Sequence, residues 1–580
     1  MSKLSVDQKT VMALLGDKKN IFLIPDYQRP YAWGRSECDT LWNDLFAFAL
    51  PDNDYSKFDD VNDEYFLGPL VTFPNEDKKQ EVIDGQQRLT TLMLLLRAFY
   101  PRFENMQDEN SVATRQSIEK CLWKTNAFGK PDMTSCKLET EVATDEAVQE
   151  FRDILRTGNA PDNAKSNYAE NYRFFQAKID EFMQSFGSYL AYFPIRILNN
   201  CILLPIEADS PEVAMRIFST LNDRGKPLSD SDIFKSQLYK HYNATGRKDE
   251  FIARWKDLDE LCQEIYHPIA GTPMDEAFTR YMYYERAKAG IKSSTTESLR
   301  KFYEKGSYDL LKHDETFDNI VDLTNFWRSI AVQDKARFSD LTLRRLFVLN
   351  YAPNGMWTYI TSVYYLANRD ANGLLDDKEF RGFLHKITAF IWGYSFTNPG
   401  VNALRTPLYD EMVNIINGKE VTFGEYKLPL DQLDIAINNY VFTNMRPITR
   451  SMLAWWAFND KAQGLLDIAQ PFQIEHIYPK KRFELENNFS DKRNLESLGN
   501  KALLEARINI RASDYKFDDK IKYYEGFNNS RGQLIGKTNI SELRNISQHF
   551  SDFKESEIVQ RKALMIQKFI EYLKRNDLIA

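Results

Sequence analysis

The 580-residue sequence changes its hydrophobic pattern twice, and this division constrains the fold more than any single motif. Up to about Tyr239, short β-like runs such as NIFLIP, EYFLGPLVTF, QEVIDG and NCILLPIEA alternate with helical stretches. From about His241 to Met445, apolar residues recur at three- and four-residue spacing and strand patterns are almost absent. A chain of this length also exceeds what one hydrophobic core serves. We therefore expect a multi-domain α+β protein with domains at 1–240, 241–445 and 446–580.

Two shorter segments refine this division. The stretch from about Pro101 to Phe193 is polar and helical in period, so we expect a helical insertion between strands of the first domain. The third domain opens with a helix, ITRSMLAWWAFND, and closes with an amphipathic helix around Ile558 to Leu573. No internal repeat or low-complexity segment interrupts these blocks.

The composition is that of a soluble protein of a reducing compartment. The N-terminus lacks the layout of a signal peptide, and no apolar run approaches the roughly 18 residues that a membrane span needs. The five cysteines are scattered and form no CxxC pair, which argues against a disulfide framework and against a zinc knuckle. We expect a cytoplasmic protein without a membrane partner.

Charge is distributed unevenly along the chain. The net charge of −8 disfavours nucleic acid as a partner of the whole molecule, but from Glu475 to the end there are 20 Lys+Arg against 16 Asp+Glu. A mildly basic part of this kind permits contact with phosphate. Short basic runs such as Lys480–Arg482 are typical of plain solvated surface.

The segment KKQEVIDGQQRLTTLMLLL combines a short strand, a turn at Asp84-Gly85 and a helix that opens near Gln86. Gly85 can adopt backbone conformations that other residues resist, so another group can approach closely. The first helix amides favour an anion there, and Arg88 adds a guanidinium suited to phosphate oxygens. Asp84 could hold a metal or orient water. Such turns are also common as purely structural elements, and both interpretations stay open.

Two further segments carry polar residues in irregular surroundings. IPDYQRPYAW places Gln28 and Arg29 between two prolines and among aromatic residues, where they could hold a base or a phosphate or simply cover a hydrophobic plug. FSTLNDRGKPLSDSDIF predicts a helix end at Asn222–Gly225. A new helix, capped by Ser229 or Asp230, should follow.

Three ordered motifs resemble the GmrS-type half of the GmrSD restriction endonucleases, which form the modification-dependent (type IV) class. They are Tyr27–Tyr31 (YQRPY), Asp84–Arg88 (DGQQR) and Asn222–Gly225 (NDRG) with Leu228. The resemblance implies a domain similar to ParB and sulfiredoxin that hydrolyses a nucleotide, whether GTP, ATP or another nucleoside triphosphate. It also implies a nucleotide site formed by Gln28, Arg29, Asp84, Gly85, Gln86, Gln87, Arg88 and Asn222.

The stretch QIEHIYPKKRF, which begins at Gln473, sets one of only six histidines directly after a glutamate. A buried Glu-His pair is costly unless something compensates it, so the pair is either a local structural feature or part of a reactive centre. We expect FQIEHI to end a strand that Pro479 stops, LESLGNKALL to form a second strand, and a helix with Asn509 near its start to follow. Because adjacent strand residues point to opposite faces, Glu475 and His476 can share one centre only if the strand ends or bends there.

These residue types suit phosphodiester hydrolysis. The reaction needs a base that deprotonates water and a cation that stabilises charge on the leaving oxygen. Histidine titrates near pH ~6.5, so an imidazole can accept that proton at neutral pH. Carboxylate and amide oxygens are hard ligands suited to Mg²⁺ or Mn²⁺.

The same stretch resembles the HNH nucleases, in particular the GmrD-type domain, whose pattern is (D/E)H-I-x-P, then GN, then a further Asn and a Lys. The resemblance implies a ββα-metal fold. It implies that Glu475 is a metal ligand, His476 the general base and Asn500 the structural middle residue. Asn509 would be the second protein ligand, and Lys520 matches the trailing lysine, whose role stays open. Lys501 departs from the pattern, because an apolar residue usually follows GN; a strand position that faces outward would accommodate it.

Both motif sets occur in one chain, in the family's order. This predicts a nucleotide-regulated, metal-dependent DNA endonuclease that acts on foreign, modified phage DNA in antiviral defence. Two alternatives stay open: a nucleotide-switched nucleic-acid-binding regulator with a silent HNH centre, and an infection-triggered RNase or toxin. One HNH centre cuts one strand per encounter, so a double-strand break would need two visits or two chains, which leaves a homodimer open.

Overall fold

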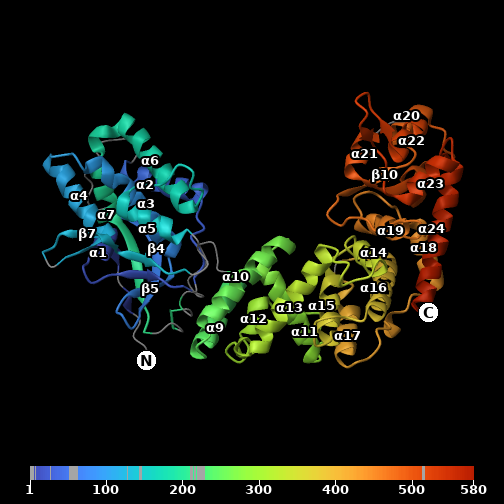
Figure 1. Cartoon of the computed structure of the whole chain (residues 1–580), viewed down its shortest axis with the longest axis horizontal. Coiled ribbons are helices and arrows are strands. Elements are labelled where there is room, and N and C mark those ends of the chain that lie inside the picture. The colour runs from blue at the N-terminus through green and yellow to red at the C-terminus, as the bar shows by residue number, and fades with distance from the viewer. Residues whose placement is uncertain are drawn as a thin grey trace. The chain divides into compact units, whose positions relative to one another are not determined.

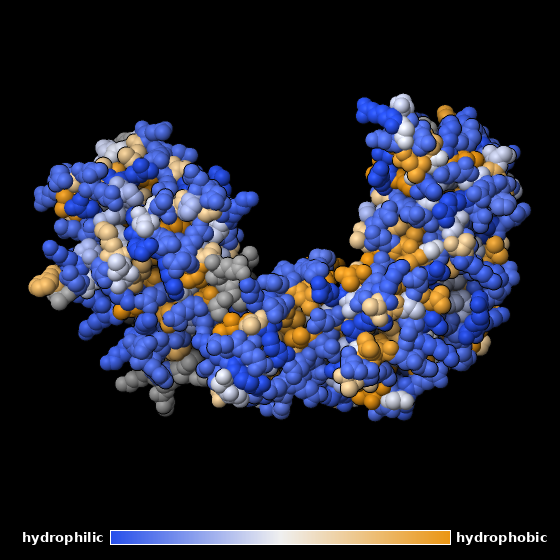
Figure 2. All heavy atoms as spheres, viewed as in Figure 1, coloured by the Kyte–Doolittle hydropathy of each residue, from blue (hydrophilic) through white to orange (hydrophobic). Residues whose placement is uncertain are grey.

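The computed structural model of the chain (Figure 1) describes residues 5–6, 8–26, 28–50, 63–126, 128–142, 147–209, 213–214, 217, 229–400, 402–512 and 516–580. The chain divides into two compact units, Met1–Lys256 and Asp257–Ala580. Within the described ranges, no helix is both long enough and apolar enough to cross a bilayer. On the face drawn in Figure 2, hydrophilic residues predominate and apolar ones are interspersed among them.

A mixed seven-stranded sheet organises the first unit. Its strands run in the order β1-β9-β4-β5-β3-β8, and β2 also pairs with β9. The strands of this unit are β1 (Ser5–Val6), β2 (Lys9–Thr10), β3 (Phe22–Ile24), β4 (Tyr65–Pro74), β5 (Gln80–Asp84), β6 (Trp123–Thr125), β7 (Pro131–Cys136), β8 (Leu138–Thr140) and β9 (Cys201–Glu207). The helices are α1 (Val11–Leu15), α2 (Arg35–Ala49), α3 (Gln86–Phe99), α4 (Glu109–Leu122), α5 (Val148–Thr157), α6 (Asn167–Phe186), α7 (Tyr192–Asn200) and α9 (Asp230–Ala244), with α10 (Lys248–Ile265) continuing past the unit boundary.

Helix α3 lies in the core of this unit. All of its residues except Arg88 are buried, because its apolar side chains surround the whole circumference rather than one stripe. The most apolar run of the sequence, LTTLMLLLRAF, therefore lies in a core helix. The expected strands NIFLIP, EYFLGPLVTF, QEVIDG and NCILLPIEA are confirmed as β3, β4, β5 and β9, and Ser229 caps α9 as expected.

The expectation of a purely helical insertion between Pro101 and Phe193 is wrong. The segment contains β6, β7 and β8 beside its helices, and β8 extends the main sheet by pairing in parallel with β3. The short strand was hidden because only Leu138 and Thr140 are buried in it, within polar surroundings. Three residues are too few for a period of two to stand out.

The second unit is mostly helical. Its helices are α11 (Pro273–Lys288), α12 (Leu299–Tyr303), α13 (Asp314–Ala331), α14 (Asp340–Leu349), α15 (Met356–Asn368), α16 (Asp377–Thr397), α17 (Arg405–Ile416), α18 (Leu430–Asn439), α19 (Pro447–Ala457), α20 (Lys480–Glu486), α21 (Ala506–Ala512), α22 (Phe517–Glu525), α23 (Ser541–His549) and α24 (Glu555–Arg575). Its strands are β10 (Phe472–His476), β11 (Lys501–Glu505), β12 (Phe527–Asn528) and β13 (Leu534–Ile535). The strandless middle of the chain, the helix near Arg446 and the C-terminal helix are confirmed within the described residues.

The antiparallel pair β10–β11 is the frame of the C-terminal end of the chain. Its register sets His476 opposite Lys501 and Glu475 opposite Ala502. The expected second strand begins later than LESLGN suggests, because Lys492–Glu496 and Leu498–Asn500 form two 3₁₀ turns first. The single helix expected afterwards is two short ones, α21 and α22, of which α21 carries Asn509.

Close packing of α24 explains the glycine that precedes β11. A Cβ added to Gly499 would lie 2.0 Å from the Ile558 carbonyl oxygen and 2.9 Å from the Lys562 amide nitrogen, both backbone atoms of α24. The same helix sends Arg561 to this turn, where its guanidinium donates to the carbonyls of Gly499 and Lys501 at 2.9 and 2.8 Å. The turn and the helix therefore fix each other.

Gly499→Ala should destabilise this end of the chain by about 1–3 kcal/mol or more, because the backbone of α24 must move to admit the methyl group. Differential scanning calorimetry should show a lower unfolding temperature. Gly464→Ala is the matched control, since nothing lies within 4 Å of a Cβ added there. Equal unfolding temperatures for the two variants would contradict this account of the packing.

Candidate functional site

The two faces of β10 carry different polar groups. The pairing of β10 with β11 continues through His476, and the next backbone amide, that of Ile477, still donates to the Asn500 carbonyl at 2.9 Å. The strand therefore neither ends nor bends between Glu475 and His476. Their side chains contact separate sets of partners, so the structure does not bring them to one centre.

Glu475 lies in a buried polar cluster with α22. One of its carboxylate oxygens accepts from Lys520 Nζ and from Tyr524 Oη, each at 2.6 Å. Lys520 Nζ also donates to the His476 carbonyl at 2.7 Å. All three side chains of the cluster are almost inaccessible to solvent. The Lys520 ammonium therefore neutralises the charge of this carboxylate inside the fold.

Asn509, on α21, contacts β10. Its side-chain Nδ2 donates to Gln473 Oε1 at 2.9 Å, a bond in which the amide oxygen, the atom that would bind a cation, takes no part. The Lys520 ammonium compensates the charge of the Glu475 carboxylate through Oε1. Among the described residues, no group of three or more His, Cys, Asp or Glu side chains is arranged to hold a metal.

His476 faces a second, more accessible charged cluster. Its Nε2 lies 3.5 Å from Glu496 Oε2 and makes no hydrogen bond to any described group. Glu496 in turn pairs with Lys480 and, at 2.6 Å, with Lys501. The Lys480 side chain is about half exposed, so solvent reaches the edge of the cluster.

Electrostatics keep both acid–base groups of this cluster deprotonated. Burial and the positive charge of Lys501 lower the pKa of His476 to about 4, against the opposing effect of Glu496. Burial raises the pKa of Glu496, but the hydrogen bonds from Lys480 and Lys501 outweigh it and bring that pKa to about 2. At neutral pH the imidazole is therefore neutral and has a ring nitrogen able to accept a proton.

Asn500 bridges two segments from inside the fold. Its Oδ1 accepts from the Tyr478 amide at 2.7 Å, and its Nδ2 donates to the carbonyls of Tyr478 and Leu495 at 3.0 and 2.9 Å. It is fully buried. The side chain thereby ties the backbone after His476 to the turn before β11, which is a structural position.

Two expectations about lysines need correction. Lys501 does not face outward: its side chain is fully buried and donates to Glu496, to Asn444 Oδ1 at 2.8 Å and to the Phe442 carbonyl. The run Lys480–Arg482 is not plain solvated surface either. Lys480 pairs with Glu496, and the Arg482 guanidinium makes a bidentate ion pair with the Asp552 carboxylate. Sequence reasoning missed Glu496 altogether, because no spacing relates it to His476.

In the first unit, the two DGQQR glutamines hold the YQRPY loop. Gln87 Oε1 accepts from the amides of Ala32 and Trp33 at 2.7 and 3.0 Å, and its Nε2 donates to the Pro30 carbonyl at 3.2 Å. Gln86 Nε2 donates to the Arg29 carbonyl at 3.1 Å, while its Oε1 is buried without a hydrogen-bond partner. The two predicted motifs therefore lie together.

The remaining residues of this predicted site gather at the start of α3. Gly85 has a left-handed φ of 91°, with Leu70 and the Pro69 carbonyl close to where a Cβ would lie. Burial raises the pKa of Asp84, and the Gly85 amide and the positive charges of Arg88 and Arg29 oppose this rise. Arg88 donates to the Pro69 carbonyl at 2.8 Å. Gln28 is buried, and Tyr27, Asn222–Gly225 and Leu228 lie outside the described residues.

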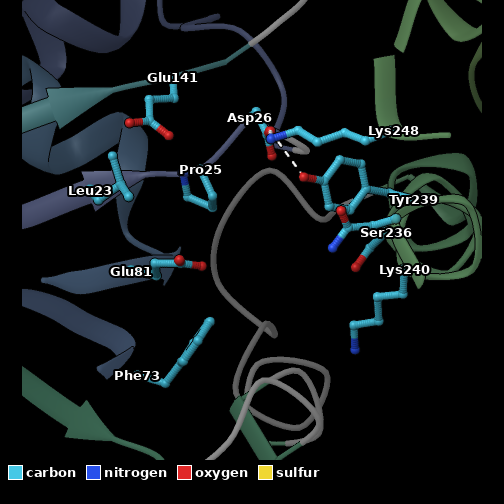
Figure 3. A pocket seen from close by; sticks show the side chains of 11 residues that line it. Leu23, Pro25, Asp26, Phe73, Glu81, Glu141, Ser236, Tyr239, Lys240 and Lys248 are labelled. Atoms are coloured by element: carbon cyan, nitrogen blue, oxygen red, sulfur yellow. Dashed lines mark hydrogen bonds and ion pairs between the residues drawn. The ribbon is translucent and has the colours of Figure 1, made fainter. Parts of the chain in front are cut away.

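A cavity of about 280 Å³ lies on another side of this unit, between the sheet and α9 (Figure 3). Asp26 closes one wall, because its carboxylate pairs with Lys248 and accepts from Tyr239 Oη at 3.0 Å. The rest of the lining includes Glu81, Glu141 and Lys240. None of the predicted nucleotide-binding residues within the described part of the chain is among its lining residues.

Comparison with protein families finds a match at each end of the chain. A model described as the GmrSD restriction endonuclease N-terminal domain matches residues 11–239, and one described as the GmrSD restriction endonucleases C-terminal domain matches residues 436–568. A comparison with curated proteins finds no match. The two matches together span more than half of the chain, in the order of the family's domains, and include DGQQR and the Glu475-His476 pair. The chain belongs to the GmrSD restriction endonuclease family.

Proposed function

We propose that the C-terminal unit is an HNH-type nuclease that cleaves foreign, modified DNA, with His476 as the general base. The observation that carries this proposal is the state of the imidazole: it is neutral at neutral pH, its Nε2 faces the Glu496 carboxylate, and two lysines lie around it. An anionic phosphodiester suits such surroundings. Membership of a restriction endonuclease family supplies the substrate class.

In the proposed reaction, a water molecule loses a proton to the imidazole of His476. The resulting hydroxide oxygen forms a bond to phosphorus while the bond from phosphorus to the sugar oxygen breaks. The departing oxygen takes a proton from solvent, and the imidazolium later returns its proton to water. Asn500 holds the backbone beside His476 and touches neither reactant.

Dependence on Mg²⁺ or Mn²⁺ remains a prediction from the family resemblance. When bound, such an ion would stabilise charge on the leaving oxygen. The resemblance would place it at the Glu475 carboxylate and the Asn509 amide oxygen, where the Lys520 ammonium already neutralises Glu475. Chelation with EDTA followed by addition of each ion tests the requirement directly.

We further propose that the first unit binds and hydrolyses a nucleoside triphosphate at the start of α3. Arg29 and Arg88 would bind phosphate oxygens there, and Asp84 would orient water. The support for this site is the proximity of these groups: the charges of Arg29 and Arg88 act on the Asp84 pKa, and the Gln86 side chain holds the Arg29 carbonyl at the start of α3. Nucleotide turnover would then license cleavage by the second unit.

His476→Ala should lower the rate of DNA nicking by about 10²- to 10⁴-fold, because the proton acceptor is lost. The assay compares phage DNA that carries modified cytosines with its unmodified counterpart and with RNA, with and without nucleotide. Nucleotide hydrolysis should be unchanged. His549→Ala is the matched control, since His549 is exposed and its ring contacts the Asn545 carbonyl of its own helix.

Undiminished nicking by His476→Ala would contradict the assignment of the base. Cleavage confined to RNA would favour the alternative of an infection-triggered RNase. Binding of nucleic acid without cleavage of any substrate would favour the regulator with a silent centre.

Arg88→Ala should abolish nucleotide hydrolysis, because the phosphate contact is lost. Phosphate release is the measurement, with GTP, ATP, CTP and UTP as substrates. Arg88 also holds the Pro69 carbonyl, so the unfolding temperature is recorded in parallel. Arg156→Ala is the matched control, because that side chain is largely exposed and pairs, among the described residues, with Asp153 one turn away. Retained hydrolysis by a folded Arg88→Ala protein would contradict the proposed site.

A further inference from the structure

Lys501 is a buried cation at a position where an apolar side chain would fit the strand. It lies directly opposite His476 in the β10–β11 pair and is fully inaccessible to solvent. Burying an ammonium group is costly unless its protons are all used. Here they are used by Glu496, Asn444 and the Phe442 carbonyl. Burial lowers the pKa of Lys501, and Glu496 opposes that effect.

Glu496 is the only one of these three acceptors that carries a charge, and it is the one that faces the imidazole. It ends the 3₁₀ turn Lys492–Glu496. Lys480 contacts one carboxylate oxygen and Lys501 the other, at 2.6 Å. The oxygen bonded to Lys501 is also the one that lies 3.5 Å from His476 Nε2. The orientation of Glu496 toward the ring is therefore set by Lys501.

Building on the proposed nuclease function, we propose that Lys501 and Glu496 are positioning residues for His476. Lys501 fixes the carboxylate, and the carboxylate favours the imidazole tautomer with its proton on Nε2. The lone pair then lies on Nδ1, which accepts the proton from water. A carboxylate beside the ring also stabilises the imidazolium formed in that step.

The opposite face of the strand does not supply this function. Glu475, although adjacent to His476 in sequence, gives its carboxylate to Lys520 and Tyr524. The carboxylate that faces the base comes instead from a residue 20 positions further along the chain. The lysine that departs from the family pattern and the glutamate that it holds thus form one unit.

The test compares Glu496→Gln and Lys501→Met with wild type, with Glu484→Gln and Lys481→Met as matched controls. Glu484 and Lys481 are exposed on α20 and make no ion pair with described residues. Nicking rates are measured over a range of DNA concentrations. Both site variants should lose at least about tenfold in kcat with little change in KM, as expected when a base is misplaced rather than when DNA binding is lost. Both controls should match wild type, and Glu496→Asp should recover part of the loss.

A second measurement does not depend on cleavage. Nitrogen NMR of the full-length chain labelled with ¹⁵N-histidine reports the ring tautomer of each of its six histidines, and His476→Asn identifies the signal. Wild type should show the Nε2-protonated form at pH 7.5. Glu496→Gln and Lys501→Met should each shift that signal toward a tautomer mixture, whereas the two controls should not.

Three outcomes overturn the proposal. One is an Nδ1-protonated ring in wild type, and another is an unchanged tautomer in both site variants. The third is a Glu496→Gln protein that regains the full wild-type rate when more Mg²⁺ or Mn²⁺ is added, which would make Glu496 a cation ligand instead. If wild type cleaves no nucleic acid, the proposed nuclease function fails, and the NMR measurement still decides whether Lys501 and Glu496 position the ring.

Discussion

The register between β10 and β11 determines the chemistry available at the C-terminal end of this chain. In the observed register, His476 shares a face with Lys501, and Glu475 points toward α22. A shift by one residue would exchange the two faces, because side chains alternate along a strand. The register is fixed from outside the pair: Asn500 bonds both backbone groups of Tyr478, and α24 packs on Gly499 so closely that no side chain fits. Gly499 and Asn500, the GN of the motif, therefore act by holding a strand in place.

In the first unit, too, a buried amide side chain holds an irregular backbone segment. Gln87 satisfies three backbone groups of an irregular loop, as Asn500 does for the segment after His476. Both side chains are buried amides, which can accept and donate hydrogen bonds at the same time. They therefore satisfy backbone groups that, in an irregular segment, have no strand partner to bond to. In both units, the amide side chains of the predicted motifs make their hydrogen bonds to the protein backbone. The groups that remain for a ligand are the charged ones beside them: Arg29 and Arg88 in one unit, and His476 with the half-exposed Lys480 in the other.

Local pattern was sufficient to predict the strands β3, β4, β5, β9 and β10, the helices α3, α19 and α24, and the strandless middle of the chain. Most of these elements are long or strongly periodic, and the three residues of β3 form an unbroken apolar run, FLI, that is buried throughout. The three-residue strand β8 was missed, because a period of two cannot be recognised over so few residues. The residues that contact Glu475 and His476 could not be predicted from the sequence either. Nothing in the sequence relates Glu475 to Tyr524 or His476 to Glu496, since these contacts depend on how a turn and a helix return to the strand pair. The expectation that Glu475 and His476 share one centre required the strand to end or bend between them. That expectation is wrong, because the pairing of β10 with β11 continues through His476.

The balance of charge on the two faces then indicates which one suits a phosphodiester. On the α22 face, the carboxylate of Glu475 is matched by one ammonium, and all members are sealed from solvent. On the other face, one carboxylate, Glu496, is matched by two ammonium groups beside a neutral imidazole, which leaves an excess of one positive charge. That excess lies at an accessible edge, where an anion can gain from it without the cost of entering a closed core. The same two lysines keep Glu496 ionised, so the carboxylate can orient the ring without competing for its proton. Attraction of the substrate and orientation of the base would thus depend on one set of charges, and Lys501 contributes to both.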